Sequence, residues 1–199
     1  MLENEVKKYA ALNSLAKQNG TVIFGGGEDT AIPLCELKQA FSIEGELYNR
    51  SISGLSVDDA AVAFDLCAAP LCPDAVLLHL GKADLKHFKE APAEFDSKYR
   101  GLIAHIRSAV PDCRIAVISL KNPGNDADIT ELNRHLKSAA QAEKCEFDDI
   151  ADENVRDPSE NARLFSFVHS LGFVSPLQSR RPLYDLARIL FCCAPVTGN

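Results

Sequence analysis

Residues 21–31 read TVIFGGGEDTA, a run of strand-forming residues that leads into three glycines and an acidic pair. A helical pattern that includes Leu34, Leu37 and Phe41 follows. This order is typical of a β-strand, a tight turn and the start of a helix. In an open α/β sheet, ligands bind beside such turns, at the carboxyl ends of the strands. We therefore expect the functional site of the protein at this turn.

Strand and helix patterns alternate along the rest of the chain, which implies right-handed βαβ units and a parallel sheet. We predict an α/β fold, a three-layer α/β/α sandwich around a flavodoxin-like, five-stranded parallel sheet. The predicted strands are 21–25, 46–49, 75–80, 114–119 and 145–148. The predicted helices are 31–42, one that begins after Ser56, 93–109, 128–142, 160–170 and 181–193.

A further helix, predicted over residues 2–18, precedes the first strand and stops at Asn19-Gly20. We therefore divide the chain into an N-terminal helical arm, 1–19, and a single α/β domain, 20–199. A chain of 199 residues is long enough for one domain with a substantial core. The arm can pack on the domain or on a second copy as a homodimer, and we favour the domain.

The charge and hydropathy of the chain exclude several classes of partner. The net charge is −7 and the pI is about 5.2, which argues against a nucleic-acid or anionic-membrane surface. No apolar run approaches the roughly 20 residues of a membrane helix. The charged N-terminus lacks the apolar core of a signal peptide. We expect a cytoplasmic protein whose partner is a small-molecule or protein ligand at the strand ends.

The chain has seven cysteines, an odd number, and no CxxC pair. Zinc sites usually show paired cysteine spacing, so we interpret these residues as reduced thiols that act as small hydrophobic side chains. We expect no metal and no cofactor.

Four segments resemble the sequence blocks of the SGNH (GDSL-type) hydrolases, in the family's order, over about residues 20–193. The segment 22–28 resembles the first block, a strand that ends in Gly-Asp-Ser, and 47–54 resembles the second, Asn-x-x-x-Ser-Gly. The segment 78–84 resembles the third, Gly-x-Asn-Asp. Residues 173–176 stand where the family carries Asp-x-x-His-Pro. The resemblance implies the SGNH-hydrolase fold and, for a complete site, ester hydrolysis.

The catalytic positions of the family are largely substituted. The resemblance places Glu28 at the serine nucleophile, Gly54 at the oxyanion-hole glycine and Ala83 at the oxyanion-hole asparagine. It places Gly172 and Ser175 at the triad aspartate and histidine. Acyl transfer needs a nucleophile, a base and donors for the oxyanion, and these side chains do not supply them.

We therefore predict a non-catalytic binding or interaction module that retains the binding cleft implied by the resemblance. The residues expected to line that cleft are Gly26, Gly27, Glu28, Asp29, Ser53, Gly54, Gly81, Asp84 and Ser175.

A divergent esterase or acetylhydrolase, with its nucleophile and base relocated, is the alternative. A register shifted by one residue would make Thr30 the nucleophile, and Ser53 or Ser51 are further hydroxyls. His169 is the candidate base, because it lies close to the expected histidine block. His79 lies inside a predicted central strand, where a packed, hydrogen-bonded histidine is the competing interpretation.

The glycine turn suggests two other kinds of site. The oxygens of Glu28, Asp29 and Asp84 would suit Mg²⁺ or Ca²⁺ in a metal-assisted hydrolase. The competing interpretation is that Asp29 or Thr30 caps the next helix, Asp84 caps the turn after the third strand and Glu28 faces solvent. A dinucleotide site is disfavoured, because Thr30 replaces the last glycine of the fingerprint and the acidic pair would repel a pyrophosphate.

Overall fold

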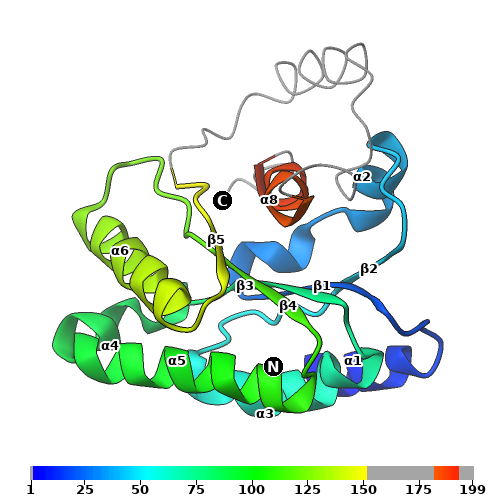
Figure 1. Cartoon of the computed structure of the whole chain (residues 1–199), viewed down its shortest axis with the longest axis horizontal. Coiled ribbons are helices and arrows are strands. Elements are labelled where there is room, and N and C mark those ends of the chain that lie inside the picture. The colour runs from blue at the N-terminus through cyan, green and yellow to red at the C-terminus, as the bar shows by residue number, and fades with distance from the viewer. Residues whose placement is uncertain (1, 152–181, 193–199) are drawn as a thin grey trace.

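The computed structural model describes residues 2–151 and 182–192, and five parallel strands form one sheet within them (Figure 1). The strand order is β2-β1-β3-β4-β5. Both the predicted alternation and the predicted parallel sheet are confirmed. The strands are β1 (Gly20–Gly25), β2 (Glu46–Asn49), β3 (Ala75–His79), β4 (Arg114–Ile118) and β5 (Glu146–Asp148).

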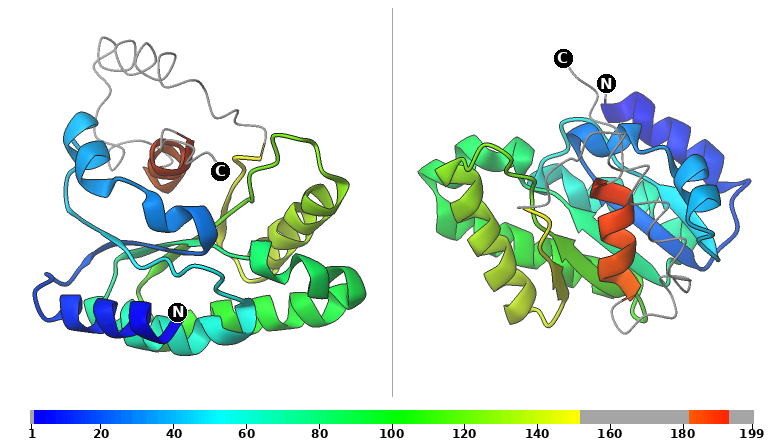
Figure 2. Two further views of the ribbon diagram at one scale, coloured as in Figure 1. Left: turned by 180° about the vertical axis from the view of Figure 1, so that it is seen from behind. Right: turned by 90° about the horizontal axis from the view of Figure 1, so that it is seen from above.

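Helices cover both faces of the sheet, as Figure 1 and the views from behind and above in Figure 2 show, so the three-layer sandwich is also confirmed. The helices are α1 (Leu2–Asn13), α2 (Leu34–Ala40), α3 (Val57–Cys67), α4 (Leu85–Glu90), α5 (Pro92–Ala109), α6 (Ala127–Ala142) and α8 (Pro182–Ala187). Three short 3₁₀ turns are η1 (Gly27–Ala31), η2 (Ala69–Leu71) and η3 (Lys82–Asp84), and a π-helical turn, η5 (Arg188–Cys192), continues α8.

The two faces of β1 contribute to two separate parts of the core. Val22 and Phe24 belong to the larger cluster, with side chains of α3, α5 and α6, whereas Ile23 belongs to a smaller cluster with α2 and α8. This division follows from the alternation of side chains along a strand. Every residue of β1 is buried, as expected of a parallel strand covered on both faces.

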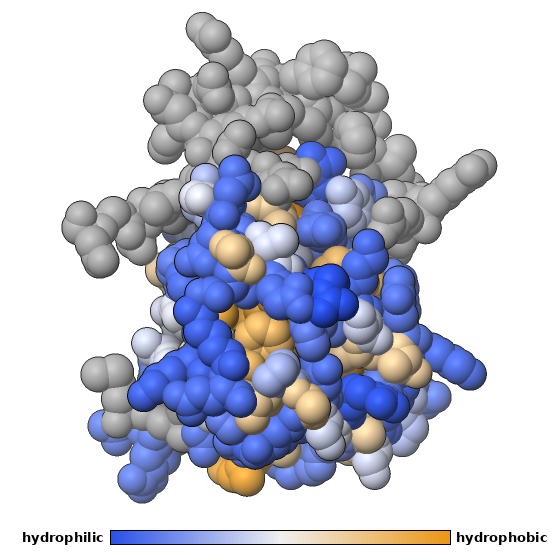
Figure 3. All heavy atoms as spheres, turned by 90° about the vertical axis from the view of Figure 1, so that its left-hand side faces the viewer, coloured by the Kyte–Doolittle hydropathy of each residue, from blue (hydrophilic) through white to orange (hydrophobic). Residues whose placement is uncertain are grey.

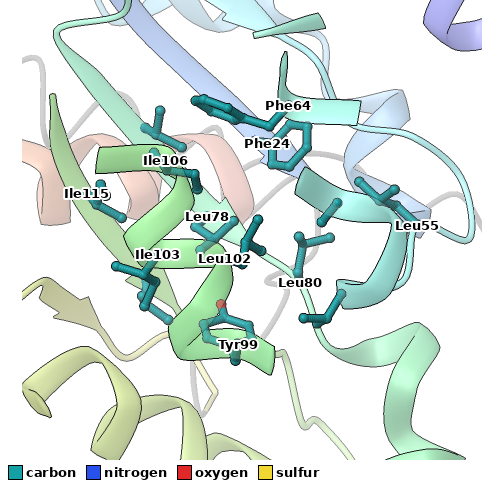
Figure 4. Close-up of a cluster of buried hydrophobic side chains, with 14 of the residues drawn as sticks. Phe24, Leu55, Phe64, Leu78, Leu80, Tyr99, Leu102, Ile103, Ile106 and Ile115 are labelled. Atoms are coloured by element: carbon teal, nitrogen blue, oxygen red, sulfur yellow. The ribbon is translucent and has the colours of Figure 1, made fainter. Parts of the chain in front are cut away.

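Aromatic rings and aliphatic side chains pack together in the larger cluster (Figure 4). The rings of Phe24 and Phe64 meet edge to face with centroids 5.4 Å apart, and both side chains are fully buried. Tyr99 of α5 is also fully buried, between the sheet and the other helices. The contact between Phe24 and Phe64 buries a large apolar area and packs α3 against β1.

The chain reverses its direction of travel across the sheet between β1 and β3. It moves from β1 outward to β2, then crosses back to place β3 on the other side of β1. At this switch point Gly25 at the end of β1 pairs with His79 at the end of β3. In open α/β sheets, the crevice at the carboxyl ends of two such strands is where ligands bind.

Helix α1 lies on the domain and is held there by hydrogen bonds. The hydroxyl of Tyr9 donates to the carbonyl of Ser51 at 2.8 Å. The buried guanidinium of Arg50 donates to Asn13 Oδ1 from Nε and Nη2, at 3.2 and 2.9 Å, and lies over the Tyr9 ring. Contact of this arm with a second copy stays a prediction.

Two predicted helix boundaries were wrong, and proline explains one of them. The helix predicted over 31–42 begins only at Leu34, because Pro33 holds Ile32 in an extended conformation. The helix predicted over 93–109 matches α5, whereas the short helix α4 before it was not predicted. The first helix ends at Asn13 in a tight turn rather than at residue 18. The helix predicted over 160–170 and the family segment 173–176 lie outside the described residues.

The surface of the described residues agrees with the charged composition of the chain. Hydrophilic residues cover most of the side seen in Figure 3, with apolar residues scattered among them. No helix in the described ranges is both long and apolar enough to span a bilayer.

We predict that Phe64→Ala destabilises the protein by about 3–5 kcal/mol, because it leaves a cavity beside Phe24 at the centre of the core. Urea denaturation followed by circular dichroism measures the change. Val62→Ala is the matched control on the same helix: the Val62 residue is 65% exposed, and we expect a change within about 0.5 kcal/mol. A loss below about 1 kcal/mol for Phe64→Ala would contradict the packing described above.

Candidate functional site

Three segments meet at the carboxyl ends of β1, β2 and β3. They are η1, the loop 50–56 and η3. Gly26 forms a parallel bridge with Ile52, which joins the first two segments. Lys82 of η3 donates to Glu28 of η1 at 2.7 Å. The carboxylate of Asp84 accepts from the backbone N–H of Val57 at 3.1 Å, which joins η3 to the end of the loop.

The structure therefore brings the segments of Glu28, Gly54 and Ala83 to one edge of the sheet. The other positions named from the resemblance, Gly172 and Ser175, and the candidate base His169 lie outside the described residues. Whether the described residues line a binding cleft stays a prediction.

Glu28, at the position that the resemblance assigns to the nucleophile, is a charged carboxylate. Its side chain is 67% exposed and forms an ion pair with Lys82. The hydrogen bond from Lys82 lowers the pKa of Glu28, and the charges of Lys82 and Lys121 act in the same direction against partial burial. The expectation that Glu28 faces solvent is confirmed, but its partner Lys82 was not foreseen.

Of the two positions that the resemblance assigns to the oxyanion hole, Gly54 keeps the family's residue and Ala83 does not. Gly54 has a φ of +69°, and a Cβ built on it would meet no atom within 4 Å. Glycine is therefore favoured there by backbone conformation rather than by space. Ala83 lies exposed in η3, and its methyl side chain has no hydrogen-bond donor.

Asp29 and His79 form a buried pair at the switch point between β1 and β3. Asp29 Oδ2 and His79 Nδ1 are 2.8 Å apart, and their side chains are 5% and 12% exposed. The interpretation that Asp29 or Thr30 caps the next helix was wrong, because the N-cap residue of α2 is Pro33 and this helix has no side-chain cap. The Asp29 carboxylate contacts His79 instead. The interpretation of His79 as a packed, hydrogen-bonded histidine is confirmed for Nδ1.

Gly25 makes room for this pair. A Cβ at position 25 would lie 2.1 Å from Asp29 Oδ2 and 2.8 Å from the carbonyl oxygen of His79. Asn49 of β2 fixes the turn from the other side: its Nδ2 donates to the Asp29 carbonyl at 2.7 Å and its Oδ1 accepts from the Ser51 N–H at 2.9 Å. Gly25 was not among the predicted site residues, although three glycines before an acidic residue were the available signal.

Asp84 caps α3. Both of its carboxylate oxygens lie within 3.2 Å of the Val57 N–H, while Ser56 Oγ accepts from the Asp59 N–H. The expectation that Asp84 caps the turn after β3 was wrong. Burial is the main cause that raises the pKa of the Asp84 carboxyl above its usual value.

The hydroxyls proposed as relocated nucleophiles are not paired with a base in the described residues. Thr30 Oγ1 donates to the Gly27 carbonyl at 2.9 Å, Ser53 is exposed, and Ser51 Oγ is buried without a hydrogen-bond partner. The histidines in residues 2–151 face carboxylates instead. These pairs are His79–Asp29, His87–Glu94, His105–Asp65 and His135–Asp96.

The acidic residues at the strand ends do not form a metal cluster. Glu28 pairs with Lys82, Asp29 with His79 and Asp84 with the end of α3. Within residues 2–151 and 182–192, no group of three or more His, Cys, Asp or Glu side chains could hold a metal ion. Burial also raises the pKa of the Cys67 thiol to about 11, which disfavours the reactive thiolate.

Comparison with known proteins places these observations in context. The model of the GDSL-like Lipase/Acylhydrolase family matches residues 16–169. No curated protein matches the chain by sequence.

Several solved structures are similar to this chain. A protein provisionally described as a platelet activating factor from Streptococcus pneumonia is 20% identical, with a TM-score of 0.63 over 78% of this chain and 77% of that one. A GDSL-like lipase from Bacteroides thetaiotaomicron is 18% identical, with a TM-score of 0.55 over 72% and 77%. A catalytic mutant of an acetylxylan esterase from Geobacillus stearothermophilus is 15% identical, with a TM-score of 0.55 over 91% and 99%. At these identities the likeness concerns the fold.

We predict that Gly25→Ala lowers the free energy of unfolding by about 3 kcal/mol, because the new methyl group would overlap the Asp29 carboxylate and the His79 carbonyl. Thermal and urea denaturation measure the loss. Gly101→Ala is the control: Gly101 lies in α5, where an added Cβ would meet no atom within 4 Å, and we expect a gain of about 0.5–1 kcal/mol. Equal effects of the two substitutions would refute the close approach at Gly25.

The raised pKa of Asp84 predicts a pH dependence of stability. A carboxyl group whose pKa is higher in the folded state stabilises the protein fully below its unfolded value, near 3.8, and loses this contribution as pH rises through the folded value. Asp84→Asn keeps an acceptor for Val57 without the charge. We therefore expect the stability of Asp84→Asn, relative to the original chain, to improve from pH 3 to pH 7.

Asp84→Ala is the companion variant. It removes the acceptor as well as the charge, so we expect a loss of about 1–2 kcal/mol at pH 7. Urea denaturation across the pH range measures both variants. A stability difference between Asp84→Asn and the original chain that falls with rising pH would contradict the assignment.

Proposed function

The chain belongs to the GDSL-like Lipase/Acylhydrolase family, and we propose that it is a member without the family's acyl-transfer centre, which acts as a non-catalytic binding or interaction module. The single observation that carries this proposal is the Glu28–Lys82 ion pair. A charged carboxylate, held by a lysine, occupies the position where the resemblance places the nucleophilic serine. Among the described residues, no hydroxyl is paired with a histidine that could activate it.

The chemistry of acyl transfer opposes hydrolysis at Glu28. A carboxylate is a weak nucleophile toward an ester, and its negative charge would raise the energy of an oxyanion that forms beside it. Ala83 supplies no donor, and loss of one such donor typically costs about 10²–10³ in kcat. The retained glycine, Gly54, is accounted for by its backbone conformation. With Glu28 and Ala83 at these positions, no described side chain is assigned a step of the family's reaction.

The ligand of the module is expected at the switch point, between the carboxyl ends of β1 and β3. One relative of the same fold is an acetylxylan esterase, so acetylated xylan fragments are the first ligand class to screen. Lys82, with Glu28 across from it, stands at the rim of this edge and can contact a polar ligand. The cytoplasmic location and the small-molecule or protein partner stay part of the proposal.

A divergent esterase or acetylhydrolase is the second candidate, and the Asp29–His79 pair favours it. An imidazole held by a carboxylate is the arrangement of a general base. The candidate still requires a nucleophilic hydroxyl at the free nitrogen of His79, and the Thr30 hydroxyl donates to Gly27 instead. No observation at Glu28, Asp29 or Asp84 favours the metal-assisted hydrolase.

We predict that the purified protein hydrolyses p-nitrophenyl acetate no faster than buffer and is not labelled by a fluorophosphonate. A catalytically active acetylxylan esterase serves as the positive control, because the relative described above is a catalytic mutant. Glu28→Ala should leave any trace rate unchanged, because Glu28 performs no catalytic step. Turnover together with labelling of one residue would overturn the non-catalytic role and identify the relocated nucleophile.

Binding is tested separately, by calorimetric titration with acetylated xylooligosaccharides. We expect Lys82→Ala to weaken binding several-fold, because Lys82 lies at the proposed ligand edge. Lys17→Ala is the matched control, since Lys17 forms an exposed ion pair with Glu46 at the opposite end of β2. Equal effects of the two substitutions would argue against a ligand at the carboxyl ends of the strands.

A further inference from the structure

The two ring nitrogens of His79 have different environments. Nδ1 lies 2.8 Å from the Asp29 carboxylate. Nε2 is buried and has no hydrogen-bond partner within the described part of the chain. A buried polar atom without a partner costs about 1–3 kcal/mol, and most such atoms in folded proteins are satisfied. The free nitrogen of His79 therefore requires an explanation.

Asp29 determines what the free nitrogen can do. An ionised carboxylate only accepts hydrogen bonds, so Nδ1 of a neutral His79 must carry the proton. Nε2 then carries a lone pair instead of a proton, so it can accept a hydrogen bond but cannot donate one. Gly25 holds this arrangement in place, because only a residue without a Cβ leaves space for the Asp29 carboxylate.

Phe191 covers the imidazole on the side of the C-terminal helix. The two ring centroids are 4.7 Å apart, and the Phe191 side chain is buried. Phe191 lies in the π-helical turn η5, and single π-helical turns are frequent at functional sites. The Phe191 ring thus provides an apolar surface beside the imidazole.

A second pair in the chain provides a comparison. His135 is also held by a carboxylate, Asp96, and also contacts a phenylalanine ring, Phe88. Its Nε2, however, lies 3.2 Å from Arg134 Nη2 and 3.4 Å from a Glu131 oxygen. His135 belongs to α6 rather than to a strand end. His87 Nε2 of α4 also lacks a hydrogen-bond partner, but it lies 3.5 Å from a Glu94 oxygen. The unpaired nitrogen of His79 differs in its place, because it lies at the switch point where ligands bind in such sheets.

We propose that Nε2 of His79 accepts a hydrogen bond from a hydroxyl group of a ligand, which binds between the carboxyl ends of β1 and β3 with an apolar face against Phe191. The inference rests on the proposed binding function and names its ligand class: an alcohol or sugar-like molecule that combines a hydroxyl donor with an apolar surface. Ligands that carry only acceptors in this position are excluded, because they would leave Nε2 unsatisfied.

The first test measures the tautomer of His79 by ¹⁵N NMR of the imidazole nitrogens in the full chain. We expect a protonated Nδ1 and an unprotonated Nε2. In Asp29→Asn the amide can donate to Nδ1, so we expect the proton to shift toward Nε2. A proton on Nε2 of the original protein at neutral pH would overturn the proposal.

The second test measures selectivity for a hydroxyl with two probes of the same ring, benzyl alcohol and benzyl methyl ether. Phe191→Ala opens a space beside Nε2, and we expect it to bind the alcohol about tenfold more tightly than the ether. The alcohol should also move the Nε2 resonance. Phe88→Ala, beside His135, is the matched control and should show no preference. Equal affinities for the two probes in Phe191→Ala would overturn the proposal.

These outcomes are distinct from a failure of the proposed function. Ester turnover would overturn the non-catalytic role and leave the tautomer of His79 as described. A protonated Nε2, or equal binding of the two probes, would overturn the assignment of Nε2 as an acceptor even if the esterase assay shows no hydrolysis.

Discussion

The close contact of Gly25, Asp29 and His79 is the constraint on which the strand ends depend. Because a Cβ at position 25 would overlap Asp29 Oδ2, the end of β1 must be glycine for the carboxylate to reach His79. The hydrogen bond then joins the turn after β1 to the end of β3, across the point where the strand order reverses. Asn49 extends the link to β2, because its amide donates to the Asp29 carbonyl. The ends of β1, β2 and β3 are thus fixed relative to one another by side chains as well as by the backbone hydrogen bonds of the sheet.

Much of the fold could be predicted because its signals are local. The alternation of apolar strands with amphipathic helices marks βαβ units, and the uninterrupted burial of β1 follows from a sheet covered on both faces. The failures were local as well. The extended Ile32 before Pro33 delays the start of α2, whereas an apolar periodicity read across that proline suggests an earlier start. The short helix α4 was not predicted.

The site was harder to predict, because its contacts join residues that are distant in sequence. The order of the family blocks in the sequence predicted that the segments of Glu28, Gly54 and Ala83 lie at one edge of the sheet, as the structure shows. From the local sequence alone, however, an acidic residue after a glycine turn is expected to cap the next helix. Asp29 instead bonds to a residue 50 positions away, and Asp84 caps a helix that starts 27 positions earlier. Gly25 and Lys82 were missed for the same reason, since each matters only through a partner on another segment.

The arrangement at the strand ends separates two properties that an esterase combines. A hydrolase of this family needs a nucleophile and a base that meet, with donors for the oxyanion. Here the position of the nucleophile carries a carboxylate neutralised by Lys82, while a histidine held by a carboxylate lies buried between β1 and β3. An imidazole without a hydroxyl partner cannot activate a nucleophile of the protein. The same lone pair can still recognise a hydroxyl of a ligand, since acceptance of a hydrogen bond needs neither Glu28 nor a donor at Ala83. Recognition without turnover is therefore the function that we propose for this set of side chains.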